Sequence, residues 1–270
     1  MDNLVLIKLG GSLITDKTIP YTPRLQILAD LAGQIAHVRK SLPGLSMILG
    51  HGSGSFGHTA AREYGTRQGL QALVDTSRYW GGFAEVWYQA SALNRLVMEA
   101  LHTAGLSAVS LVPVSSVTAS DGRVEHWDLA PIQAALSAGL LPVVYGDVIF
   151  DQKRGGTILS TEDLFEYLTL HFNPQQILLL GLESAVWADY PARKRRIEKI
   201  TPLTFADIQG SLGASHGADV TGGMESKVRQ MLKLVAAVPG LKVQIFSGEE
   251  AGSLQKALNG ETPGTLLTAD

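Results

Sequence analysis

The segment Gly50–His58 has the sequence GHGSGSFGH and directly follows the apolar run Leu45–Leu49, which is typical of a strand. Because glycine has no side chain, backbone N–H groups in such a segment can approach the oxygens of a phosphate group closely. We therefore interpret this strand end as a candidate site for a ligand that carries phosphate.

Glycine clusters also follow other expected strands. These clusters are Gly10-Gly11-Ser12, Gly146-Asp147 and Gly181, and Gly222-Gly223 precedes an expected helix. Any single cluster is equally compatible with an ordinary turn, since such short matches have a high false-positive rate. Ligands of parallel sheets bind outside the carboxyl ends of the strands, so several clusters at one edge favour a shared phosphate site.

Three lysines accompany these clusters: Lys8 ends the first strand, Lys17 lies in the loop that follows, and Lys227 lies in the first turn after Gly222-Gly223. A lysine near a helix N-terminus is unfavourable unless an anion lies nearby, which makes Lys227 informative. The P-loop and dinucleotide-binding fingerprints are both absent. The lysines taken singly are typical surface charges, but together they predict a different phosphate-binding chemistry.

Composition limits the classes of function. The chain has 270 residues, 45% of them hydrophobic, and a net charge of −3, so its charge does not favour a nucleic acid or an anionic membrane as partner. The absence of cysteine excludes disulfides, thiolate metal sites and a cysteine nucleophile. No apolar run is long enough for a membrane span, and no signal peptide is evident. We expect a cytoplasmic protein that acts on a small molecule.

Short apolar runs alternate with segments of helical period, which predicts an α/β fold with a mostly parallel sheet. The expected strands are 4–9, 45–49, 107–112, 141–145, 177–180 and 242–246, and the expected helices are 23–40, 76–104, 161–171 and 224–238. Hairpins are expected at 114–124 and 148–159. A second run of strand and helix signals begins near Asn173-Pro174, which suggests a boundary between lobes 1–173 and 174–270 of one continuous sheet.

Four motifs together resemble the isopentenyl phosphate kinases of the amino acid kinase superfamily. They are KLGGS with a lysine shortly after it (8–17), HGSGSFGH (51–58), GDVIFD (146–151) and DVTGGMxxKV (219–228). The resemblance implies a three-layer α/β/α sandwich, an acceptor lobe, an ATP lobe and a homodimer. It also implies transfer of a phosphoryl group from ATP, with Mg²⁺, to isopentenyl phosphate.

The resemblance assigns roles to individual residues. Ser53, Gly54 and His58 are expected to bind the acceptor phosphate, and Gly156 and Thr157 to close over it. ATP is expected to contact Lys8, Gly10, Gly11, Ser12, Gly54, Asp189, Gly222, Gly223 and Lys227. Lys8, Lys17, Lys227 and Mg²⁺ offset the repulsion between two phosphates, and Asp147 is expected to pair with Lys8 and Lys17. No residue is assigned as a metal ligand, and His51 is interpreted as a strand-end packing residue.

The acceptor tail requires an apolar pocket. Trp80, Phe83, Trp87 and Ala90 fall on one helical face, and with Ile149 and Ile158 they could surround a five-carbon chain. In the prediction Phe83, Trp87 and Ile149 contact the substrate. The alternative is that this aromatic stripe belongs to the core.

Three departures from the family pattern keep other functions open. Ser53 replaces a glycine, residues 160–163 are STED where SGDD is usual, and residues 181–187 lack two expected acidic side chains. The first alternative is a fosfomycin-type phosphonate kinase of the same superfamily, which shares the phosphate-binding histidine but would prefer a small polar acceptor. The second is a nucleotide-binding regulator or storage protein without turnover.

Overall fold

The structure is a computed structural model that describes residues 3–70, 75–211 and 223–270. Its centre is an eight-stranded sheet in which β15 and β16 are antiparallel and every other neighbouring pair is parallel. The strands follow the order β14 (Lys199–Ile200), β16 (Thr265–Leu267), β15 (Lys242–Ser247), β11 (Gln176–Gly181), β1 (Leu4–Leu9), β4 (Ser46–His51), β8 (Leu141–Tyr145) and β5 (Ala108–Ser110). The mostly parallel sheet confirms the predicted fold class.

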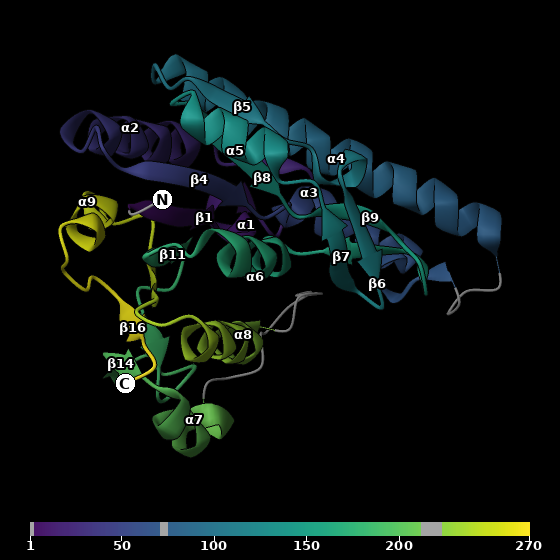
Figure 1. The fold of residues 1–270 in the computed structure, drawn as a ribbon. Helices are drawn as coiled ribbons and strands as arrows, with labels where there is room; N and C mark the ends of the chain where they lie inside the picture. Colours follow the sequence, from purple (N-terminus) through teal and green to yellow (C-terminus); the bar gives the residue numbers. More distant parts are fainter. Residues whose placement is uncertain (1–2, 71–74, 212–222) are drawn as a thin grey trace.

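Helices cover both faces of this sheet, because the strands alternate between two apolar cores. In β1, Val5, Ile7 and Leu9 face the core that contains α1 (Gly11–Ile14), α2 (Leu25–Ser41), α4 (Thr76–Thr103) and α9 (Ser253–Leu258). Leu4 and Leu6 face the opposite core, which contains α5 (Ala130–Ser137), α6 (Thr161–Phe172), α7 (Pro202–Ile208) and α8 (Gly223–Ala237). The arrangement is a three-layer α/β/α sandwich (Figure 1).

A second sheet of four strands stands beside the large one. Its order is β10 (Gly155–Leu159), β9 (Asp147–Asp151), β6 (Val117–Ser120) and β7 (Arg123–Trp127). It contains both predicted hairpins. The long helix α4 extends past the large sheet alongside these strands (Figure 1). Two smaller ribbons pair β2 (Thr15–Asp16) with β3 (Thr22–Pro23), and β12 (Val186–Trp187) with β13 (Arg196–Ile197).

The opening segment differs from the loop that the sequence suggests. Strand β4 extends to His51, and helix α3 (Gly54–Tyr64) begins two residues after Gly52. The glycines of this helix conceal it in the sequence, since glycine is a poor helix former. Gly57 is required because a side chain there would collide with the side chain of Ser53. Residues 54–58 of the HGSGSFGH motif therefore form the first turn of a helix.

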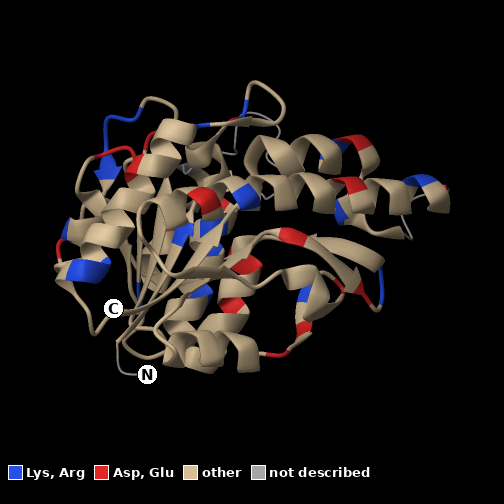
Figure 2. Cartoon of the chain, turned by 90° about the horizontal axis from the view of Figure 1, so that it is seen from above, with Lys and Arg blue, Asp and Glu red and all other residues tan. Residues whose placement is uncertain are grey.

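The large sheet runs through the predicted lobe boundary, because β1 pairs directly with β11. The division into lobes 1–173 and 174–270 stays a prediction. Lys and Arg lie among Asp and Glu across the face seen in Figure 2. Within the described part of the chain no helix is long and apolar enough to cross a membrane.

Candidate active site

A pocket lies at the carboxyl ends of β1, β4 and β11, where the glycine clusters meet. Nine of the predicted site residues line it: Lys8, Gly10, Gly11, Ser12, Lys17, Ser53, Gly54, His58 and Lys227. Gly146 and Gly181 line it as well. Residues separated by more than 200 positions in the sequence are therefore brought together at one sheet edge, as expected for ligand sites of open parallel sheets.

One buried carboxylate holds two of the lysines. Lys8 follows Leu4 and Leu6 in the alternation of β1, so its side chain points to the face covered by α6 and α8. There its Nζ forms an ion pair with Glu162 of α6, and Lys227 of α8 lies 3.9 Å from the same carboxylate oxygen. Glu162 is 7% exposed and Lys8 8%, so this pair is shielded from water, whereas the Lys227 side chain is 30% exposed.

The electrostatics of the cluster keep Glu162 ionised. Burial alone would raise the pKa of the Glu162 carboxyl, but Lys8 and Lys227 outweigh it and lower the pKa to about 2. Burial also lowers the pKa of Lys8, and the facing carboxylate opposes that effect. The result is a net positive cluster at the pocket wall, suited to bind anionic oxygens.

Glu162 forms the ion pair with Lys8 that was expected of Asp147. Asp147 is 1% exposed, does not line the pocket, and accepts hydrogen bonds from the backbone N–H groups of Val148, at 2.8 Å, and Val114. In the described residues it forms no ion pair with Lys8 or Lys17, so the predicted pairing is wrong. The missed signal was the STED segment, where Glu162 stands at the start of α6 and was taken only as a departure from the family pattern.

The backbone around Gly54 is packed too tightly for side chains. A Cβ atom on Gly11 would lie 2.7 Å from Gly54 Cα, and Gly54 has a φ of 50°, in the left-handed region that favours glycine. Thr15 Oγ1 donates to Gly11 O at 2.7 Å and accepts from Ser55 N–H at 2.9 Å. The backbones of the loops after β1 and β4 therefore pack closely against each other at the N-terminus of α3, a position that favours anions.

Beyond His58 the pocket changes character. Ala61 of α3, Val86 of α4 and Ile158 of β10 line it together with Arg67. Arg67 belongs to the short helix η1 (Thr66–Gln68), which lies past the far end of α3. Arg67 was missed from the sequence because it stands in no recognisable pattern.

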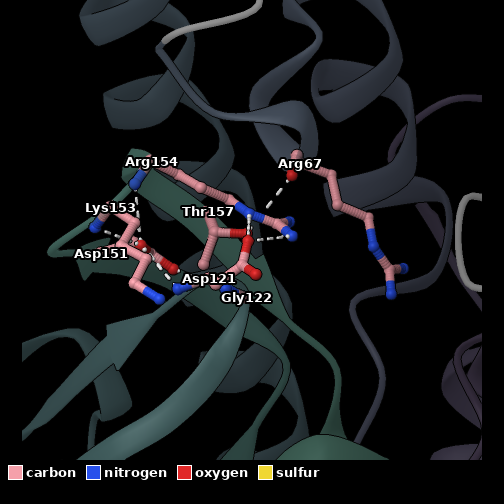
Figure 3. Close-up of polar contacts among 7 residues, drawn as sticks. All are labelled: Arg67, Asp121, Gly122, Asp151, Lys153, Arg154 and Thr157. Atoms are coloured by element: carbon pink, nitrogen blue, oxygen red, sulfur yellow. Dashed lines mark hydrogen bonds and ion pairs between the residues drawn. The ribbon is translucent and has the colours of Figure 1, made fainter.

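A polar framework fixes the segment that carries Arg67. Thr157 Oγ1 donates to Arg67 O at 3.3 Å, and the N–H of Leu70 donates to Arg154 O at 2.7 Å. Arg154 in turn pairs with Asp121 at 2.8 Å. Figure 3 shows these turns together, with the side chain of Arg67 extending away from them. Thr157 therefore supports the pocket wall from behind, where direct contact with the acceptor had been expected.

Buried Asp151 joins the two hairpin turns. Its carboxylate accepts hydrogen bonds from four backbone N–H groups, those of Asp121, Gly122, Lys153 and Arg154, at 2.7 to 3.1 Å (Figure 3). Burial would raise the pKa of Asp151, but these donors outweigh it and lower the pKa. The second sheet is thereby held as one unit against the pocket.

The predicted tail contacts need correction. Trp87 is 42% exposed and does not line the pocket, whereas the preceding residue Val86 is 2% exposed and does. Ile149 is buried in the core shared with α5 and α6, because successive residues of β9 face opposite sides. Phe83 packs with Tyr79, Val86 and Val148 behind the pocket wall, so the core alternative holds for much of the aromatic stripe.

Gly156, Asp189 and Gly223 do not line this pocket. A Cβ on Gly156 would lie 2.8 Å from Tyr79 Oη and 3.0 Å from Phe83, so this glycine permits close packing of β10 on α4. Asp189 accepts hydrogen bonds from Lys194 N–H and Arg195 N–H and closes a loop. Gly223 begins α8, and Gly222 lies outside the described residues. Contact of Asp189 and the two glycines with ATP stays a prediction.

Comparisons with known proteins agree with this geometry. The model of the amino acid kinase family matches residues 3–247. The chain belongs to the amino acid kinase family.

Similar proteins within this family are named isopentenyl phosphate kinases. The chain is 33% identical to isopentenyl phosphate kinase of Methanothermobacter thermautotrophicus, over 98% of this chain and 99% of that one. It is also 33% identical to isopentenyl phosphate kinase of Haloferax volcanii, over 99% of this chain and 100% of that one. A crystal structure of an isopentenyl phosphate kinase superposes with a TM-score of 0.83 at 29% identity, covering 98% of this chain and 100% of that chain.

Proposed function

We propose that this amino acid kinase family member transfers the γ-phosphoryl group of ATP to isopentenyl phosphate and so forms isopentenyl diphosphate. One observation carries the proposal. A single pocket has a cationic end, with Lys8, Lys17 and Lys227, that continues past His58 into a mainly apolar end lined by Ala61, Val86 and Ile158 together with Arg67. Such a pocket fits an acceptor with a phosphate head and a short hydrocarbon tail. The similarity to curated isopentenyl phosphate kinases supports the same substrate.

The residues at the cationic end divide the work. The N–H groups of Ser53 and Gly54 and the side chain of His58 bind the acceptor phosphate. Lys8 and Lys227, held by Glu162, and Lys17 from the β2–β3 ribbon stabilise the charge on the transferring group. No general base is required, because a phosphate monoester with a second pKa of about 6 already presents a nucleophilic oxygen at neutral pH. Catalysis is then positioning and electrostatic stabilisation.

Mg²⁺ fits this site only in company with the nucleotide. Among the described residues no group of three or more His, Cys, Asp and Glu side chains could hold a metal ion. Mg²⁺ commonly binds through substrate phosphates and waters with few protein carboxylates, so ATP would supply its ligands here. When bound, the ion neutralises phosphate charge.

We also propose that the protein is a homodimer in the cytoplasm. Light scattering coupled to size-exclusion chromatography tests the dimer.

A steady-state kinase panel tests the function. The acceptors are isopentenyl phosphate, dimethylallyl phosphate, geranyl phosphate and fosfomycin, each with ATP and Mg²⁺, and ³¹P NMR identifies the product. We expect the highest kcat/KM with a five-carbon phosphate. Preference for fosfomycin would instead favour the phosphonate kinase alternative, and nucleotide binding without turnover of any acceptor would favour the regulator.

A further inference from the structure

His51 is the last residue of β4 and directly precedes residues 52–54, which we call the acceptor loop. Its side chain is fully buried, with 0% exposure. Its ring stacks on Tyr145, with centroids 5.3 Å apart and an interplanar angle of 13°. Nδ1 lies 3.1 Å from the carbonyl oxygen of Gly52, and Nε2 lies 3.1 Å from Oδ1 of Asn94 in α4. A residue interpreted as simple packing therefore makes two polar contacts inside the protein.

These contacts belong to a series of hydrogen bonds, called the relay below, that links Ser110, Asn94, His51 and Gly52. A neutral imidazole carries one N–H, so it can donate at only one of its two nitrogens. The oxygen and nitrogen of an Asn amide can be exchanged without moving the group. In the structure Asn94 Nδ2 donates to Ser110 Oγ at 2.9 Å and Oδ1 faces Nε2 of His51. We infer the exchanged orientation, in which the Asn94 amide donates to Nε2 and accepts from the Ser110 hydroxyl. With that orientation the ring donates through Nδ1 to Gly52 O, 3.1 Å away, and each donor among Ser110, Asn94 and His51 that takes part in these contacts has an acceptor.

The electrostatics favour the neutral ring. Burial lowers the pKa of His51, and the nearby positive charge of Lys8 lowers it further, while the contacts with Asn94 and Gly52 oppose these effects. An imidazolium here would be a second buried cation beside Lys8. The relay satisfies all of its members without that charge.

The relay fixes one peptide plane of the acceptor loop. The N–H of Gly52 donates to Leu9 O at 3.0 Å, and its carbonyl is held by His51, so this residue is tied on both sides. In a trans peptide the carbonyl and the following N–H point in opposite directions. A Gly52 carbonyl turned inward to His51 therefore turns the N–H of Ser53 outward. Ser53 lines the pocket, and within the described chain its N–H has no protein acceptor.

We propose that His51, held by Asn94, is a positioning residue that aims the Ser53 N–H at the acceptor phosphate. The inference rests on the proposed function, because it takes the acceptor phosphate as the ligand of that N–H. The backbone of His51 ties the same loop to the lysine cluster. Its carbonyl accepts from Thr161 Oγ1 at 2.6 Å, and Thr161 precedes Glu162 at the start of α6. His51 thus connects the acceptor loop to the helix that holds Lys8 and Lys227.

The decisive variants separate the hydrogen bonds from the ring stack. His51→Phe keeps an aromatic ring on Tyr145 but cannot donate to Gly52 O. His51→Asn places an amide nitrogen near the position of Nδ1 and can restore that one donor. Asn94→Leu removes the relay partner from a site outside the pocket. Tyr145→Phe is the matched control, because it removes a buried hydroxyl from the same stack, 3.3 Å from Ser91 Oγ, without touching the relay.

We expect His51→Phe to raise the KM for isopentenyl phosphate roughly 5- to 10-fold, the scale of one neutral hydrogen bond. The KM for ATP should change less than twofold. His51→Asn should recover most of the acceptor KM, Asn94→Leu should raise it in the same direction, and Tyr145→Phe should leave it unchanged. Calorimetric titration with isopentenyl phosphate alone should show the same order of Kd values.

Two results would overturn the inference while leaving the proposed function intact. One is wild-type turnover of isopentenyl phosphate with an unchanged acceptor KM in both His51→Phe and Asn94→Leu. The other is an equal rise of both KM values that follows a loss of thermal stability, which would make His51 a packing residue. If the wild-type protein turns over no acceptor, the proposed function and this inference fail together.

Discussion

At the scale of single residues, the site depends on where buried charges find partners. The carboxylate of Glu162 sits between Lys8 and Lys227, and both its carboxylate and the Lys8 ammonium are almost inaccessible to water. Removing one partner of a buried ion pair leaves an uncompensated charge, which is far more costly than losing a surface pair. Glu162 therefore affects both the position of the lysines and the stability of the site.

Glu162→Gln tests this role. The amide keeps the size of the side chain but loses the charge that holds both lysines, so we expect kcat to fall by about 10²-fold or more as the lysines lose their alignment. Steady-state kinetics with saturating ATP and isopentenyl phosphate measures the change. Glu166→Gln is the control, because Glu166 lies one turn later on α6 and contacts Gln230 outside the pocket. Equal kcat values in the two variants would contradict the organising role of Glu162.

His58 carries the second prediction at this scale. Its side chain lines the pocket in the first turn of α3, where the helix N-terminus already favours an anion. His58→Ala should lower turnover by about 10²- to 10³-fold, the scale for one donor aimed at developing charge. His58→Gln should recover part of the loss, because its amide can still donate. A near-normal rate for the alanine variant would remove His58 from the mechanism.

At the scale of elements, most strands of the large sheet and the four longest helices could be predicted from the sequence, and helix α3 could not. Apolar runs revealed β1 and β8 with their observed bounds, since buried parallel strands are continuously hydrophobic. Helix α3 was hidden by its glycines, which serve close packing and the pocket. Its side-chain positions follow from tertiary contacts that no local pattern records.

The same reasoning explains which site residues were found. Glycines and lysines at strand ends were correctly brought together, because the carboxyl ends of parallel strands share one edge. Asp147 and Ile149 were misplaced because the hairpin stands in a separate sheet, and its facing depends on how that sheet docks. Glu162 was missed because its role depends on the packing of α6 against β1 and α8.

The pocket between α3, α4 and β10 leads to the third prediction. Val86 lines its apolar end, and the neighbouring Trp87 is exposed on another face of α4. Val86→Ala removes two methyl groups from the wall, so kcat/KM for geranyl phosphate should rise relative to isopentenyl phosphate by a factor of about 10. Trp87→Ala should leave that ratio unchanged. A larger shift from Trp87→Ala than from Val86→Ala would restore the tail contact expected from the sequence.

At the scale of the whole molecule, two buried carboxyls make stability depend on pH in opposite senses. Glu162 has a folded pKa of about 2, below the usual 4.5, so its contribution is present above pH 4.5 and is lost as pH falls towards 2. Burial raises the pKa of Asp147 from 3.8 to about 7, with the N–H groups of Val148 and Val114 opposing the rise. Its contribution is complete below pH 3.8 and is lost as pH rises through 7.

The last prediction concerns Asp147→Asn. Oδ2 of Asp147 has no hydrogen-bond partner in the described structure, so above pH 7 the wild-type protein must either ionise this carboxyl without compensation or keep its proton at a cost. A pKa raised from 3.8 to about 7 corresponds to a few kcal/mol, and Asn removes the titration while keeping the shape. We expect the variant to unfold several degrees higher than wild type at pH 8 and to show a smaller gain at pH 5, measured by calorimetry.

An exposed carboxyl provides the control for this pH dependence. Asp30 is exposed on the surface of α2, so Asp30→Asn should shift the unfolding temperature equally at both pH values. Equal destabilisation by Asp147→Asn at pH 5 and pH 8 would show that this side chain is needed as a carboxylate. Turnover distinguishes the two roles further. Because Asp147 does not line the pocket, the variant should keep most of its kcat, and a large loss of kcat with full thermal stability would return Asp147 to the catalytic role expected from the sequence.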